Sequence, residues 1–207
     1  MVTTIIFDFD GVILDSMPIR KLGFVEALRD FPQEKIAALL EYHEQNGGLS
    51  RYHKFEYFYR EILQQPFEQS DILQLADAFS SIMKARLTDP SNLIQETLDF
   101  IKNNRNRYRF FIASGSDEKE LRFLCDALGI SQYFESIHGS PTPKIKLVEN
   151  ILREFKLNSE ETILIGDAHN DFEAASRNTI AFFGFNNIEL KNLGSGYIYS
   201  FESINSF

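Results

Sequence analysis

Two kinds of hydrophobic pattern divide the chain. Short strand-like runs, made mostly of consecutive apolar residues, occur at residues 5–7, 109–114 and 162–166. Runs of this kind predict buried strands of a parallel sheet, because helices cover both faces of such a sheet. Between residues 19 and 87 the apolar positions instead recur every three or four residues, which predicts about four helices and no strand.

Strand-like runs and helical segments alternate in the second half of the chain. We expect further strands at 134–138, 180–185 and 197–201, and helices at 94–101, from an N-cap at Ser116 to Gly129, at 143–155 and at 171–178. This alternation predicts an α/β fold, with a parallel sheet between two layers of helices. The expected organisation is a three-layer, Rossmann-like core formed by residues 1–15 and 89–207, with an all-helical domain inserted at residues 16–88.

Composition and charge narrow the function classes. The 207 residues carry a formal net charge of -9, which argues against a nucleic-acid-binding surface. The single cysteine, Cys125, fits a reducing compartment and looks like a buried core residue. No apolar run approaches the roughly 18 residues of a membrane span, and the first residues do not resemble a signal peptide. We therefore expect a cytoplasmic protein, monomeric or weakly dimeric, with no membrane partner.

Two carboxylates follow the first predicted strand. Asp8 and Asp10 are two positions apart, so their side chains point to the same side if the strand continues through them. Like charges placed together repel each other, and partial burial strengthens the repulsion. A bound cation or a raised pKa would relieve it, and Gly11 lets the chain turn sharply directly afterwards.

Reactive residues also follow the other predicted core strands. Ser114 and Gly115 end the second strand, Asp167 ends the strand from 162, and Lys144 opens a helix. Ligands of parallel sheets bind outside the carboxyl ends of the strands, so these groups converge if the strands are neighbours. Carboxylate oxygens suit Mg²⁺, a serine hydroxyl and backbone N–H groups can hold phosphate, and a lysine can stabilise an anionic transition state. A carboxylate is then free to act as a nucleophile.

Four segments, taken in order, resemble the haloacid-dehalogenase-like (HAD) hydrolase superfamily, in the branch that includes β-phosphoglucomutase and phosphoglycolate phosphatase. They are Asp8-Phe9-Asp10-Gly11-Val12, Ile112-Ala113-Ser114-Gly115, a lysine at a helix start, and Gly166-Asp167-Ala168-His169-Asn170-Asp171. The resemblance covers nearly the whole chain, and the helical insert resembles the small mobile cap of that family.

The resemblance implies roles for the carboxylates. Asp8 is expected to be the nucleophile, and Asp10 the acid and base that protonates the leaving oxygen and then activates water. Mg²⁺ is expected to bind Asp8, the backbone carbonyl of Asp10 and Asp167, with Asp171 orienting that shell or reaching the metal through water. The dehalogenating members lack the second aspartate, so Asp10 favours phosphate chemistry.

The phosphate-binding residues follow from the same resemblance. Ser114 and Gly115 are expected to grip the transferring phosphoryl group. Many relatives carry a lysine directly before a Pro-x-Pro helix start, where this chain has Ser140. We assign the role to Lys144, with Lys146 as the alternative; a third possibility is that both lysines are solvated and the site lacks this group.

A basic cluster in the helical insert is a candidate for substrate binding. Arg51 and Lys54 follow a Gly-Gly break in an otherwise acidic protein. We hypothesise that they contact an anionic part of the substrate, because cap residues of the family choose the substrate. The alternative is a solvated helix start.

The leading hypothesis is a Mg²⁺-dependent phosphatase that hydrolyses a small phosphorylated metabolite through an aspartyl-phosphate on Asp8. A sugar phosphomutase of the β-phosphoglucomutase type is the nearest alternative. A receiver-like phosphorylatable signalling domain is more remote, because receivers lack a helical insert and their phospho-acceptor is not on the first strand. A catalytically silent homologue is disfavoured by the intact aspartates.

Overall fold

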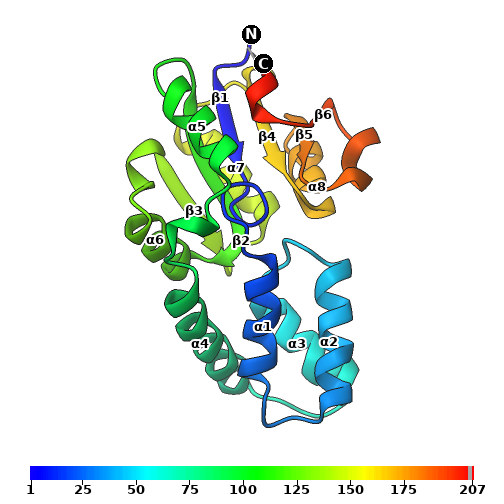
Figure 1. Ribbon diagram of the computed structural model, residues 1–207. Helices are drawn as coiled ribbons and strands as arrows, with labels where there is room; N and C mark the ends of the chain where they lie inside the picture. The colour runs from blue at the N-terminus through cyan, green and yellow to red at the C-terminus, as the bar shows by residue number, and fades with distance from the viewer. Residues whose placement is uncertain (205–206) are drawn as a thin grey trace.

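A parallel sheet forms the centre of the molecule (Figure 1). The computed structural model describes residues 1–204 and 207, and within them six strands form a sheet of order β3-β2-β1-β4-β5-β6. The strands are β1 (Thr4–Phe7), β2 (Arg109–Asp117), β3 (Ser136–Ser140), β4 (Thr162–Gly166), β5 (Ala181–Phe185) and β6 (Gly196–Ile198). The strand order reverses between β1 and β4, and ligands of such sheets bind at this point.

The side chains of β1 alternate between two layers of the core. Ile5 and Phe7 pack in a cluster that includes residues of α5 (Gln95–Asn104) and α6 (Glu118–Ala127). Ile6 packs on the other face in a cluster that includes residues of α7 (Lys144–Glu154) and α8 (His169–Arg177). β1 is therefore buried from both sides, and its first residue pairs with Arg109 of β2 and Thr162 of β4.

A block of helices is inserted between β1 and β2, beyond the carboxyl ends of the strands (Figure 1). It consists of α1 (Met17–Ala27), α2 (Gln33–Gln45), α3 (Arg51–Tyr57), a π-helical turn at Phe58–Leu63, and α4 (Gln69–Arg86). Aromatic rings fill its centre, where the ring of Phe24 lies 4.5 Å from that of Phe79 and 5.5 Å from that of Phe55. The predicted fold class, a parallel α/β core with an inserted helical domain, is confirmed.

Some predicted element boundaries were wrong. Ser116 is not the N-cap of α6, because β2 continues to Asp117, whose Oδ1 accepts the N–H of Glu120 at 3.0 Å. The helix predicted to begin at Asp171 begins at His169, so Asp171 lies inside its first turn. The last strand ends at Ile198 rather than at residue 201, where a short 3₁₀ turn begins.

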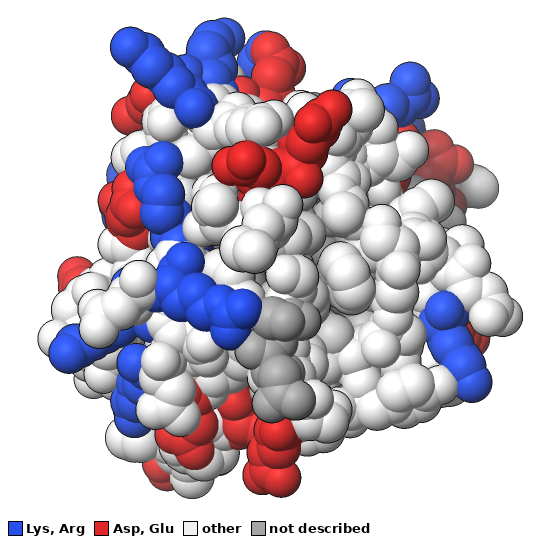
Figure 2. Space-filling model, turned by 90° about the horizontal axis from the view of Figure 1, so that it is seen from above, with Lys and Arg blue, Asp and Glu red and all other residues white. Residues whose placement is uncertain are grey.

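The surface opposite the insert carries charges of both signs. Figure 2 shows Lys and Arg mingled with Asp and Glu over part of this face, and much of the remainder without charge. This face therefore presents no continuous basic area among the residues that the structure describes. No helix within the described residues is both long and apolar enough to cross a lipid bilayer.

Candidate active site

Three buried or partly buried carboxylates meet at the carboxyl ends of β1 and β4. Oxygens of Asp8, Asp167 and Asp171 lie within 4.8 Å of one another. Asp8 directly follows β1, is 2% exposed, and accepts the N–H of Phe9 at 2.7 Å. Asp171 accepts the N–H of Ala168 at 3.0 Å, which fixes its carboxylate at the start of α8. The structure thus brings together three of the four predicted metal-binding aspartates.

Gly11 allows the loop after β1 to approach Asp167 closely. Its φ is +75°, and a Cβ added there would lie 2.0 Å from Asp167 Oδ2. A side chain at this position would therefore displace the carboxylate, and the left-handed backbone would strain most residues.

Lys144, the first residue of α7, extends its ammonium group into the carboxylate cluster. Its Nζ lies 2.9 Å from Asp8 Oδ1 and also donates to Asp171. Lys144 is 6% exposed, whereas Lys146 lies at the surface and pairs with Glu149 at 2.7 Å. Of the two candidate lysines, the structure therefore brings Lys144 to Asp8.

Burial and mutual repulsion shift the pKa values of these carboxyl groups. Burial, followed by the charge of Asp171, raises the pKa of Asp8 to about 7 even though Lys144 opposes the change. Burial and the charge of Asp8 raise the pKa of Asp167 well above its ordinary value. Burial alone would lower the pKa of Lys144, but Asp171 and Asp8 outweigh it and raise that pKa.

The carboxylate cluster fits a hard divalent cation. Its donors are carboxylate oxygens, the ligand type that Mg²⁺ prefers, and no His or Cys ligand stands among them. A cation there would relieve the repulsion that raises the pKa values of Asp8 and Asp167. Asp8, Asp167 and Asp171 are the side chains that would hold it.

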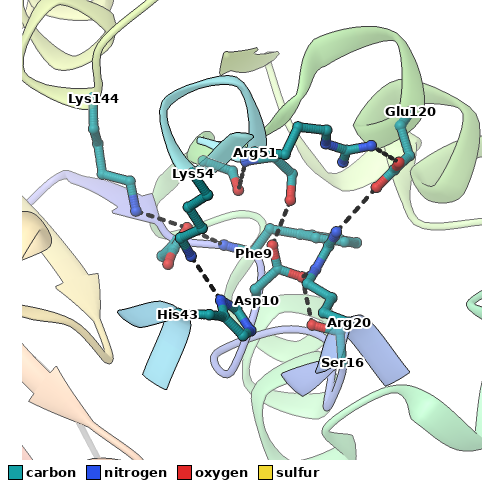
Figure 3. A network of polar contacts seen from close by, with 12 residues as sticks. Phe9, Asp10, Ser16, Arg20, His43, Arg51, Lys54, Glu120 and Lys144 are labelled. Atoms are coloured by element: carbon teal, nitrogen blue, oxygen red, sulfur yellow. Dashed lines mark hydrogen bonds and ion pairs between the residues drawn. The ribbon is translucent and has the colours of Figure 1, made fainter. Parts of the chain in front are cut away.

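The carboxylate of Asp10 is not part of this cluster and is bound by three other side chains (Figure 3). Asp10 Oδ1 accepts Ser16 Oγ at 2.5 Å and Arg20 Nε at 2.6 Å, and Oδ2 accepts Ser116 Oγ at 2.5 Å. Burial would raise the pKa of Asp10, but the Arg20 charge and the hydroxyl hydrogen bonds lower it overall. The sequence analysis missed Ser16, Arg20 and Ser116.

A cavity of about 580 Å³ lies between these strand ends and the helical insert, and Asp8, Asp10, Ser114 and Gly115 line it. Ser114 is buried, and its Oγ accepts the N–H of Ser116 at 3.1 Å. Gly115 faces the insert so closely that an added Cβ would lie 1.9 Å from the carbonyl oxygen of Gly48. The predicted phosphate-binding residues therefore line the same cavity as Asp8, under a loop of the insert.

Arg51 and Lys54 line the insert side of the same cavity. Arg51 is 4% exposed and donates to Glu120 Oε2 at 2.5 Å and to Ser80 Oγ at 2.6 Å. Lys54 is 3% exposed, and its Nζ lies 2.7 Å from His43 Nδ1. The alternative of a solvated helix start is wrong for both residues.

Burial also shifts the pKa values of Lys54 and its neighbour. It lowers the pKa of Lys54 to about 7, with a further contribution from the charge of Arg20. It lowers the pKa of His43 to about 3, with Lys54 adding to the effect. His43 is thus a neutral ring at ordinary pH, and the charge of Lys54 changes near neutrality.

Sequence comparison relates the chain to a family of hydrolases. The model of the family described as haloacid dehalogenase-like hydrolase matches residues 5–185. Among curated proteins, none matches the chain at a significant level.

Solved structures of similar architecture cover nearly the whole chain. A β-phosphoglucomutase from Clostridium difficile has a TM-score of 0.78 at 17% identity, over 99% of this chain and 94% of that one. CbbY from Rhodobacter sphaeroides, in complex with phosphate, has a TM-score of 0.74 at 18% identity, over 99% and 97%. A putative HAD-hydrolase from Bacillus subtilis bound to magnesium has a TM-score of 0.71 at 16% identity, over 97% and 96%.

Proposed function

The chain belongs to the haloacid dehalogenase-like hydrolase family, and from this premise we propose that it is a Mg²⁺-dependent phosphatase acting through an aspartyl-phosphate on Asp8. The observation that carries the proposal is the placement of Asp8. Its buried carboxylate faces the cavity, with Lys144 against one oxygen and two further carboxylates within 4.8 Å. A carboxylate so placed can attack a phosphorus atom, while cations offset the negative charge of both reactants.

In the first half of the reaction, Asp8 Oδ attacks phosphorus and the bond from phosphorus to the substrate oxygen breaks. Asp10, which is ionised in the empty site, first takes up a proton from solvent and then donates it to that oxygen, so the product leaves as an alcohol. The Ser114 hydroxyl and the N–H groups that follow it hold the phosphoryl oxygens. Lys144 stabilises the charge that develops on the phosphoryl group.

In the second half, Asp10 removes a proton from water, and the resulting oxygen attacks the phosphorus of the aspartyl-phosphate. The bond from phosphorus to Asp8 breaks, which regenerates the carboxylate and releases inorganic phosphate. Mg²⁺, held by Asp8, Asp167 and Asp171 together with the backbone carbonyl of Asp10, would supply positive charge for the phosphoryl oxygens.

The substrate we propose is a small phosphorylated metabolite with a second negative group. Arg51 and Lys54 would bind that group on the insert side of the cavity. Arg20 Nη2 and Arg51 Nη2 support this proposal, because both are buried in the described structure without a hydrogen-bond partner and both residues line the cavity. CbbY has also been solved with xylulose-(1,5)bisphosphate, a compound with two phosphates.

A sugar phosphomutase is the second candidate function, because a β-phosphoglucomutase shares the architecture at a TM-score of 0.78. A mutase uses the same phosphorylated aspartate but returns the phosphoryl group to a sugar. Supplying a hexose 1-phosphate separates the two: a phosphatase releases inorganic phosphate, whereas a mutase forms the hexose 6-phosphate.

The first experiment is hydrolysis of 4-nitrophenyl phosphate with Mg²⁺ by wild type, Asp8→Asn and, as a matched control, Glu160→Gln at the surface. We expect activity in wild type and in the control and none in Asp8→Asn. Full activity in Asp8→Asn would end the proposal. A panel of phosphorylated metabolites, assayed with wild type and Arg51→Ala, then tests whether Arg51 confers a preference for a second negative group.

A further inference from the structure

A buried carboxylate of the core contacts two arginines of the helical insert. Glu120 lies in the first turn of α6, is 0% exposed, and belongs to none of the four motifs. Its Oε1 accepts Arg20 Nη1 of α1 at 3.1 Å, and its Oε2 accepts Arg51 Nη1 of α3 at 2.5 Å (Figure 3). Both carboxylate oxygens are therefore used to bind the insert.

The two arginines that bind Glu120 make further contacts, one of which reaches Asp10, the proposed acid and base. Arg20 also donates from Nε to Asp10 Oδ1 at 2.6 Å, and Arg51 also donates from Nη1 to Ser80 Oγ of α4 at 2.6 Å. The chain of charges alternates in sign from Asp10 through Arg20 and Glu120 to Arg51, so its charges balance. It joins the loop after β1, three helices of the insert and the first turn of α6.

The position of Glu120 is fixed from the phosphate-binding side. Asp117 Oδ1 accepts the Glu120 N–H at 3.0 Å and caps α6, directly after the residues that approach the phosphoryl group. Asp117 also accepts the hydroxyl of Tyr52 of α3 at 2.7 Å through Oδ2. The segment that carries Ser114 and Gly115 thus also carries the carboxylates that bind the insert.

We infer that Glu120 is a positioning residue that ties the helical insert to the core and holds Arg20 against Asp10. Without the Glu120 carboxylate, Arg20 would keep only Asp10 as a charged partner and Arg51 would keep none among the residues that the structure describes, so both buried guanidinium groups would lose a charged acceptor. The insert would then move away from the core, and Arg20 would no longer fix Asp10. The effect on catalysis rests on the proposed function; the tie between insert and core does not.

The tie is tested by distance measurements that need no activity. Spin labels are attached at Asp30→Cys in the insert and Lys102→Cys in the core, both exposed, in a Cys125→Ser background. We expect one narrow distance distribution with native Glu120 and a longer, broader one in Glu120→Gln. Asp126→Asn, on the exposed side of the same helix, is the control and should match the native distribution. An unchanged distribution in Glu120→Gln overturns the inference.

Kinetics with 4-nitrophenyl phosphate test the positioning of Asp10. In Glu120→Gln we expect kcat to fall about tenfold or more, while KM and inhibition by inorganic phosphate stay within about twofold, because Glu120 does not contact the phosphate site. Arg20→Gln should show a similar loss, and the double variant should lose little beyond either single variant. Additive losses in the double variant, or a native kcat in Glu120→Gln, would show that Glu120 does not position Asp10 through Arg20. An inactive wild type would instead refute the proposed function. The distances between the spin labels would then still test whether Glu120 ties the insert to the core.

Discussion

Lys144 and Asp8 are in direct contact, with Lys144 Nζ 2.9 Å from Asp8 Oδ1, although one begins α7 and the other follows β1. The contact predicts that Lys144 is required for phosphoryl transfer. We expect Lys144→Met to lower kcat/KM for 4-nitrophenyl phosphate by about 10²-fold to 10³-fold, the usual loss when a charge-stabilising donor is removed. Lys146→Met is the matched control, two residues further along α7 and exposed, and should stay near native activity. Comparable losses in both variants would show that Lys144 has no special role.

Asp8 makes the stability of the metal-free protein depend on pH. Its pKa is about 7 in the folded protein, while an unfolded aspartate has a pKa of about 3.9. Between these values the folded state holds a proton that the unfolded state has lost, so stability falls as pH rises through about 7. We expect a loss on the order of 1–3 kcal/mol between pH 5 and pH 8, measured by urea unfolding in a chelator. Asp8→Asn should flatten the dependence, and an equally steep dependence in that variant would contradict the assignment.

The carboxylate cluster also predicts stabilisation by Mg²⁺. A cation bound only by the folded protein at a hundredfold excess over its Kd adds about 2.7 kcal/mol. For a chain of this size we expect Tm to rise by about 5–10 °C. Asp167→Asn should abolish most of the rise, whereas Glu160→Gln at the surface should retain it. A thermal melt with and without Mg²⁺ at pH 7.5 measures the difference, and an equal rise in Asp167→Asn would place the cation elsewhere.

The residues that the sequence analysis predicted to converge on one site share a local signal. Asp8 and Asp167 each directly follow an apolar strand, Ser114 directly follows the apolar run of β2, and parallel strands end at the same edge of a sheet. The topology was therefore sufficient to predict that they converge. The topology alone could not predict the position of Lys144, because the place of its side chain depends on how α7 packs against the sheet.

The residues that the sequence analysis missed lack such a signal. Arg20 and His43 lie on helices of the insert, and their partners are distant in the chain. Glu120 resembles any glutamate in the first turn of a helix, and only the docking of α1 and α3 buries it. Ser116 was assigned as an N-cap because a hydroxyl before a helix usually has that role, but here it donates to Asp10 instead.

The contact between Gly115 and the insert predicts a steric effect on activity. A Cβ at residue 115 would lie 1.9 Å from the carbonyl oxygen of Gly48, a backbone atom that cannot move alone. Gly115→Ala should therefore push the insert away from the core and lower kcat/KM by about tenfold or more. Gly47→Ala is the control, because an added Cβ there meets only the Ala168 Cβ at 3.6 Å. Similar activity in both variants would show that the insert need not approach Gly115 in the reaction.

The pKa of Lys54 predicts how the proposed second-anion preference changes with pH. Burial first, and then the charge of Arg20, lowers this pKa to about 7, so the ammonium group loses its charge as pH rises through neutrality. A carboxylate on the substrate stays ionised over this range, so only the protein side of the contact titrates. The ratio of kcat/KM for 3-phosphoglycerate to that for glycerol 3-phosphate should then fall about tenfold from pH 6 to pH 8.5, the equivalent of about 1.4 kcal/mol. Because both substrates share the reaction at Asp8, the ratio cancels titrations that affect the chemistry.

Variants of two lysines on the insert complete this test. Lys54→Met should give a low ratio that does not change with pH, because the titrating charge is gone. Lys21→Met, which removes an exposed lysine paired with Glu44, should keep the native pH dependence. A ratio that falls with pH equally in Lys54→Met would assign the dependence to another group, and a ratio near one at every pH in wild type would remove Lys54 from substrate selection. The free-enzyme pKa is the one reported by kcat/KM, so it can be compared directly with the value for the empty cavity.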